Sequence, residues 1–160
     1  SEQERLRLAA VNQELEQQIE TDAPLVRFAK QVEVAPDAIP LIGRPFILGS
    51  NDCWGLVMDW HATQGVKLND FRVDYPWWES QYPDNLYFDN WEREGFIECD
   101  PAPGCMVIMQ VESGKWNHAG ILLEGNMLLH HLYGHLSQRV PYGGYWQERT
   151  MKILRYKSLC

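Results

Sequence analysis

The spacing of hydrophobic residues changes once along the chain, near Pro103. Before this point, apolar positions recur every three or four residues over several stretches, which is typical of amphipathic helices. After it, short apolar runs alternate with turn residues, which predicts β-strands. Helices first and a strand meander afterwards predict an α+β domain rather than an alternating α/β fold.

Residues 1–20 are rich in helix formers, and their apolar residues share one helical face: Leu8, Val11, Leu15 and Ile19. Asp22 is placed to cap a second short helix with Pro24 in its first turn. The chain is then punctuated by Pro and Gly over residues 33–44. We interpret residues 1–39 as an N-terminal helical segment and linker, whose apolar face packs on its own domain or on another protein, and residues 40–160 as the main domain.

Two further helices are expected in the first part of the main domain. Asn51 and Asp52 offer N-cap chemistry, so a helix should begin here, place Cys53 in its first turn and stop at Gly65. A second helix is predicted near residues 85–94, ended by Gly95. The block from Phe71 to Asp100 is rich in aromatic residues and partly irregular. Its rings around Tyr75, Trp77, Trp78, Tyr82 and Trp91 would line a groove, dock onto a neighbouring protein or form a satellite cluster.

The C-terminal part predicts a small curled antiparallel sheet. Its first three strands are expected at Cys105–Val111, His118–Leu123 and Met127–Leu132, joined by hairpin turns. A fourth strand near Leu136–Val140 and a fifth near Met151–Tyr156 would complete it. The helix that carries Cys53 would pack on this sheet.

Composition narrows the class of protein. The chain has 160 residues, of which 45% are hydrophobic and 22% charged, as expected for one folded domain. A net charge of −8 repels phosphate backbones, so nucleic acid is not an expected partner. No apolar run approaches the roughly 18 to 20 residues that a membrane-spanning helix needs, and residues 1–20 are too charged for a secretory signal. We therefore expect neither membrane insertion nor an export signal.

The four cysteines, Cys53, Cys99, Cys105 and Cys160, form no closely spaced pair. Free thiols are therefore expected rather than a disulfide framework. The tight C-x-x-C pairs typical of zinc sites are missing from the sequence, although His130, His131 and His135 cluster. We expect no metal and no other cofactor.

Cys53 is a candidate nucleophile. The first turn of a helix favours negative charge, which would lower the pKa of a thiol toward neutrality and would also hold an oxyanion. The alternative is a buried structural cysteine flanked by Trp54, Leu56 and Val57.

A thiol nucleophile needs a base, and the base needs a partner that orients it. His118 begins an apolar strand, and His130 and His131 follow on the next strand. Neighbouring residues on a strand point to opposite faces, so only one of these two histidines can share a face with His118. Both faces carry apolar residues, and alternation alone does not choose between them.

Several motifs together resemble one family. They are Gly49-Ser50-Asn51-Asp52-Cys53-Trp54-Gly55-Leu56-Val57, His118-Ala119-Gly120-Ile121 and Leu128-Leu129-His130. In order and spacing they resemble the NlpC-type cysteine endopeptidases of bacterial cell walls. Residues 41–46 and 130–137 resemble the version found in tail tip assembly proteins of lambda-like long-tailed phages. The resemblance covers roughly residues 40–156.

This resemblance implies a papain-like core with Cys53 as the nucleophile and His118 as the base. His130 would orient the base, because the third residue of the family usually lies twelve positions after it. The substrate would be a peptidoglycan stem peptide, held in part by Phe46, Asp52 and Trp54. The protein would then sit in the virion tail beside other tail tip proteins and act on the host cell wall.

The sequence departs from the family pattern at three positions. The family often has tyrosine where Phe46 stands, serine where Trp54 stands and aspartate where Cys105 stands. These departures favour one alternative, a structural tail subunit that kept the fold but lost activity. A second alternative is a cellular thiol hydrolase or acyltransferase with the same architecture. Full-length tail tip proteins of this type often carry a metalloprotease-like domain with a His-x-His motif, which these residues lack. The chain would thus be a fragment or come from a phage protein without that domain.

Overall fold

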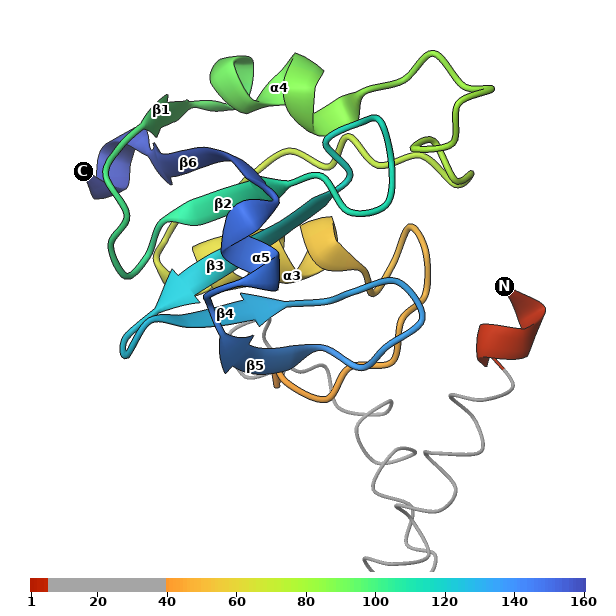
Figure 1. Ribbon diagram of the computed structural model, residues 1–160, viewed down its shortest axis with the longest axis horizontal. Helices are drawn as coiled ribbons and strands as arrows, with labels where there is room; N and C mark the ends of the chain where they lie inside the picture. Colours follow the sequence, from red (N-terminus) through yellow and green to blue (C-terminus); the bar gives the residue numbers. More distant parts are fainter. Residues whose placement is uncertain (6–39) are drawn as a thin grey trace, which may run out of the picture.

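The computed structural model describes residues 1–5 and 40–160 (Figure 1). Residues 2–5 are helical. The remainder of the helix predicted over residues 1–20, and the predicted cap at Asp22, lie outside the described residues. No helix among the described residues is long and apolar enough to cross a membrane.

The main domain is built on a six-stranded antiparallel sheet, which confirms the α+β prediction. Its strands are β1 (Phe96–Glu98), β2 (Met106–Met109), β3 (His118–Leu123), β4 (Met127–His130), β5 (Gln138–Pro141) and β6 (Thr150–Tyr156). The spatial order is β1-β6-β2-β3-β4-β5, so the last strand inserts between β1 and β2. Strands β2 to β5 form the predicted meander, whereas β1 was not predicted.

Helix α3 (Cys53–Thr63) packs against one face of the sheet, and the short helix α5 (Tyr145–Glu148) covers the other face (Figure 1). Alternation along β3 divides its side chains between two apolar clusters. Ala119 and Ile121 join the cluster that contains Leu56 and Val57 of α3. Leu122 joins the cluster on the α5 face, against which Trp146 packs. We call these two surfaces the α3 face and the α5 face.

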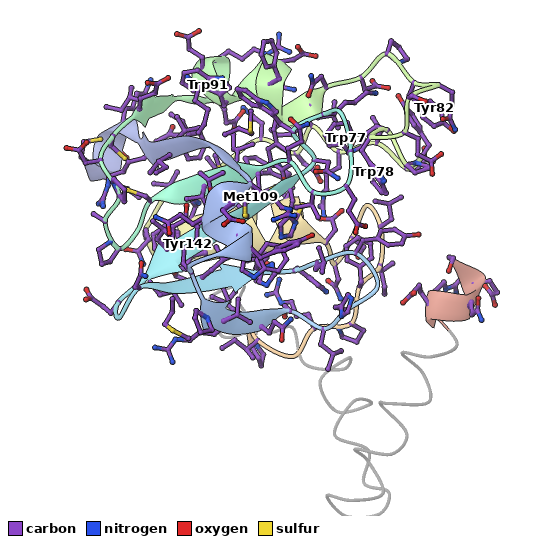
Figure 2. All side chains as sticks on the ribbon, in the orientation of Figure 1. Trp77, Trp78, Tyr82, Trp91, Met109 and Tyr142 are labelled. Atoms are coloured by element: carbon purple, nitrogen blue, oxygen red, sulfur yellow. The ribbon has the colours of Figure 1, made fainter. Side chains whose placement is uncertain are left out.

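Helix α4 (Leu86–Glu94) ends at Gly95, which adopts a left-handed conformation with φ 113°. A helix near residues 85–94 with this end was predicted. Strand β1 follows Gly95 directly, and the short 3-10 helix η2 (Lys157–Leu159) follows β6. Figure 2 shows Trp77, Trp78 and Tyr82 of the preceding segment gathered at one end of the molecule, away from Tyr142.

Candidate active site

Asp52 fixes the start of α3. One oxygen of its side chain accepts the Gly55 backbone N–H at 2.9 Å, and the other accepts the Gly49 N–H at 2.8 Å. The carboxylate therefore caps the helix and holds the preceding turn. Cys53 lies in the first turn of α3, as its position in the sequence predicts.

The half-buried Cys53 thiol lies within hydrogen-bond distance of one side chain. Its Sγ is 3.0 Å from the Tyr87 hydroxyl, and the backbone amides of Ala119 and Trp54 also bond to it. Burial and the adjacent Asp52 carboxylate nevertheless raise the pKa of Cys53 to about 12. The prediction of a pKa near neutrality was wrong, because these two effects outweigh the donors that surround the sulfur. The resting thiol is protonated.

His118 and His130 form a hydrogen-bonded pair, with 2.8 Å between Nε2 of His118 and Nδ1 of His130. The register explains it: Gly120 lies opposite His130, and His118 is two residues from Gly120 on the same face. Both rings pack against Trp146 of α5, with centroids 5.9 Å and 4.5 Å away. Burial lowers the pKa of His130 to about 4 and that of His118 well below its usual value, so both are neutral.

His131 points away from this pair. Its Nε2 donates to the carbonyl oxygen of His135 at 2.9 Å, and its ring meets Phe46 edge-on at 5.2 Å. Of the two adjacent histidines, His130 is therefore the one that contacts His118.

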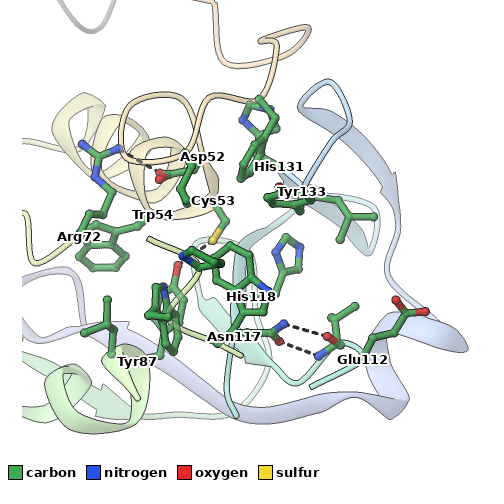
Figure 3. A pocket seen from close by; sticks show the side chains of 18 of the residues that line it. Asp52, Cys53, Trp54, Arg72, Tyr87, Glu112, Asn117, His118, His131 and Tyr133 are labelled. Atoms are coloured by element: carbon green, nitrogen blue, oxygen red, sulfur yellow. Dashed lines mark hydrogen bonds and ion pairs between the residues drawn. The ribbon is translucent and has the colours of Figure 1, made fainter. Parts of the chain in front are cut away.

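Cys53 and His118 line the same cavity, which has a volume of about 530 Å³ (Figure 3). Much of its wall is aromatic: Phe46, Trp54, Phe71, Trp77, Trp78, Tyr87, Tyr133 and Tyr145. The Lys115 ammonium holds the loop that supplies two of these rings, because it donates to the carbonyls of Trp77, Glu79 and Tyr82 at 2.7, 3.2 and 2.6 Å. Part of the aromatic segment therefore lines a groove beside the thiol.

The three residues predicted to bind substrate all line this cavity, and each is already engaged by the protein. Phe46 is buried between His131 and Tyr133. The Trp54 indole donates to the carbonyl of Asn69 at 3.0 Å. The capping carboxylate of Asp52 also pairs with Arg72 at 3.0 Å.

Sequence reasoning missed two cavity residues, Tyr87 and Arg72. Arg72 bridges Asp52 and Asp70 and also donates to the carbonyl of Ser50 at 2.7 Å. Tyr87 was one ring among many in an aromatic segment, and no local pattern sets its hydroxyl apart. Within residues 1–5 and 40–160, no group of three or more His, Cys, Asp or Glu side chains is arranged to hold a metal ion.

The comparison with known families matches residues 43–155 to the model of the NlpC/P60 family. The chain belongs to this family. Its papain-like fold agrees with the helix and sheet described above, and the predicted resemblance is confirmed.

Two curated relatives are similar over most of this chain. "Tail tip assembly protein K" of Escherichia phage N15 is 69% identical over 124 residues, which cover 76% of this chain and 51% of the relative. "Tail tip assembly protein K" of Escherichia phage lambda is 34% identical over 121 residues, covering 74% of this chain and 60% of the relative. The matched segment thus spans only about half of the first relative and 60% of the second.

Proposed function

We propose that this NlpC/P60 domain is the cysteine peptidase of a phage tail tip protein and hydrolyses peptidoglycan stem peptides during infection. The observation that carries the proposal is the cavity that holds the Cys53 thiol together with His118, whose ring is bonded to His130. The names of the two phage relatives support the placement in the tail tip and favour it over a cellular thiol hydrolase.

The neutral histidine pair can take the thiol proton in one of its tautomers. When Nε2–H of His118 donates to Nδ1 of His130, the Nδ1 atom of His118 is unprotonated and serves as the base. His130 then carries its proton on Nε2, which has no hydrogen-bond partner among the described residues. A second proton on the buried His130 would leave a charge without compensation, so His130 remains neutral and orients the base.

The reaction follows from these positions. His118 takes the Cys53 proton as Sγ attacks the scissile carbonyl carbon, and the carbonyl electrons move onto oxygen. Backbone N–H groups at the start of α3 stabilise the oxyanion. The carbonyl then re-forms and the C–N bond breaks as His118 gives the proton to the leaving amine. Water, which loses a proton to His118, attacks the thioester, and the C–S bond breaks to release the acid and the reprotonated Cys53 thiol. Because the resting thiol is protonated, its proton leaves mainly as Sγ attacks, and little thiolate accumulates before substrate binds.

Phe46 and Trp54 would contact the stem peptide as part of the aromatic wall. Asp52 would contribute chiefly by holding the turn that positions Cys53, since both of its oxygens are occupied. The partners in the virion would be the other tail tip proteins.

The direct test is release of new free amines from purified peptidoglycan. We expect cleavage by the parent protein, its loss in Cys53→Ala and its retention in Cys160→Ala, which removes an exposed thiol remote from the cavity. Cleavage should persist with EDTA, because thiol, imidazole and backbone amides supply all the steps. Activity in Cys53→Ala would exclude this nucleophile.

The alternative is a structural tail tip subunit with the same fold. The raised pKa of Cys53 and the word "assembly" in the names of both relatives favour it. A parent protein that releases no amines from peptidoglycan, yet is required for tail formation, would establish this alternative.

A further inference from the structure

The Tyr87 hydroxyl occupies a position beside the nucleophile that the mechanism above does not use. Tyr87 lies in the first turn of α4, remote in sequence from both Cys53 and His118. Its side chain is 3% exposed, lines the cavity and places the hydroxyl oxygen 3.0 Å from Cys53 Sγ (Figure 3). It therefore lies where negative charge develops when the thiol loses its proton.

The Tyr87 ring is held by other aromatic rings. Trp54, Phe71 and Trp77 surround it in edge-on contacts, with centroids 5.8, 6.1 and 6.2 Å away. Burial raises the pKa of Tyr87 well above its usual value, so the phenol keeps its proton. The hydroxyl is thus a fixed, neutral hydrogen-bond donor, and a donor that needs no reorganisation stabilises developing charge effectively.

We propose that Tyr87 is a further catalytic residue, whose hydroxyl donates a hydrogen bond first to the Cys53 thiolate and then to the oxyanion of the tetrahedral intermediate. This proposal rests on the proposed peptidase function. As the thiol proton moves to His118 and the S–C bond forms, the carbonyl electrons move onto an oxygen two bonds from the sulfur. The same hydroxyl stays within reach of that oxygen, and Tyr87 keeps its own proton throughout.

The local charges explain why such a donor is needed. Burial, and after it the Asp52 carboxylate, disfavour the Cys53 thiolate, and among the groups that favour it the Tyr87 hydroxyl has the largest effect. Asp52 is required to cap α3, so its unfavourable charge is built into the site. A hydroxyl from a different element offsets that charge without disturbing the cap.

The test uses Tyr87→Phe, which removes only the hydroxyl, and Tyr142→Phe as a matched control. Tyr142 is also buried, at 4% exposure, and its hydroxyl also makes one hydrogen bond, to Thr150 Oγ1 at 2.6 Å. It does not line the cavity. Both variants should lose similar thermal stability, so a difference in chemistry between them reports on the position of the hydroxyl.

Two readouts are compared. For Tyr87→Phe we expect kcat for peptide cleavage to fall about 10²-fold, the usual effect of removing one oxyanion donor. The rate of Cys53 alkylation by iodoacetamide at fixed pH should fall about threefold, because the thiolate population drops while its intrinsic nucleophilicity rises. Tyr142→Phe should match the parent in both readouts.

Alkylation needs no substrate, so it separates this proposal from the peptidase function. If the parent protein does not cleave peptidoglycan but Tyr87→Phe still slows alkylation, the peptidase function fails and the donor role to the thiolate stands. If the parent cleaves and Tyr87→Phe retains kcat within twofold, the catalytic role of Tyr87 is overturned. Unchanged alkylation in Tyr87→Phe overturns the donor role whatever the activity of the parent.

Discussion

At the scale of single residues, Asp52 and Cys53 impose opposing requirements on the same turn. The Asp52 carboxylate satisfies two backbone N–H groups and organises the start of α3. The same negative charge raises the pKa of the adjacent thiol. Helix position alone therefore does not lower the pKa of Cys53. Under the proposed peptidase function, the Tyr87 hydroxyl, the nearby amides and the histidine pair would have to activate it together.

The assignment of His130 rather than His131 gives the first prediction at this scale. His130→Ala removes the ring bonded to His118, so we expect kcat for peptide cleavage to fall about 10²-fold or more. His131→Ala removes a buried ring that packs on Phe46 and lines the cavity, so it should lower the melting temperature and raise KM while keeping most of kcat. Near-normal cleavage in His130→Ala with collapse in His131→Ala would reverse the assignment.

At the scale of elements, the pairing of β3 with β4 brings the two catalytic histidine candidates together. Gly120 permits this pairing, because a Cβ at this position would lie 2.7 Å from the Leu129 carbonyl oxygen and 3.0 Å from His130 Cβ. No side chain fits without separating the strands. The distance between His118 and His130 thus depends on a glycine that does not line the Cys53 cavity.

Gly120→Ala is therefore expected to impair both stability and activity. We predict a loss of about 2 kcal/mol in the free energy of unfolding, typical of an overpacked core, together with loss of peptide cleavage. Gly143→Ala is the control, since a Cβ there meets nothing within 4 Å. Urea denaturation and the peptidoglycan assay measure the two effects. A Gly120→Ala protein that matches Gly143→Ala in both would show that the strands tolerate separation.

Elements with local signals could be predicted from the sequence. The cap at Asp52, the end of α4 at Gly95 and the β3–β4 turn each depend on residues that are close together in the sequence. In that turn, Gly125 and Asn126 adopt the positive φ values expected of such residue types. The spacing typical of the family also predicted that His118 and His130 form a pair.

Elements that depend on distant partners could not be predicted in this way. Strand β1 is only three residues long and exists because Phe96–Glu98 pairs with Leu154–Tyr156 of β6, far along the chain. Helix α5 has four residues and no capping side chain. The Tyr87 hydroxyl reaches Cys53 only after α4 and α3 have packed into one domain. The sequence around either residue therefore does not predict this contact.

At the scale of the whole molecule, four histidines are buried on both sides of the sheet: His61, His118, His130 and His131. Burial lowers the pKa of each, to about 4 for His61, His130 and His131, and well below the usual value for His118. Unfolding returns these groups to about 6.5. Between these values the unfolded chain binds more protons than the folded one, so acid favours unfolding.

These histidines should consequently contribute their full stabilisation of the folded state above about pH 6.5, and this contribution should be lost as the pH falls toward 4.

His61 tests this at a position that does not line the Cys53 cavity, because its Nδ1 bonds the Val57 carbonyl within α3 and its ring packs against Phe96. His61→Gln removes one depressed pKa, so its free energy of unfolding should fall less between pH 7 and pH 5 than that of the parent. Each such histidine contributes at most about 1.4 kcal/mol per pH unit. Urea unfolding at both pH values measures the difference, with His135→Gln as the matched substitution of an exposed histidine. Equal losses in all three proteins would show that folding does not lower the pKa of His61 and that other groups control acid unfolding.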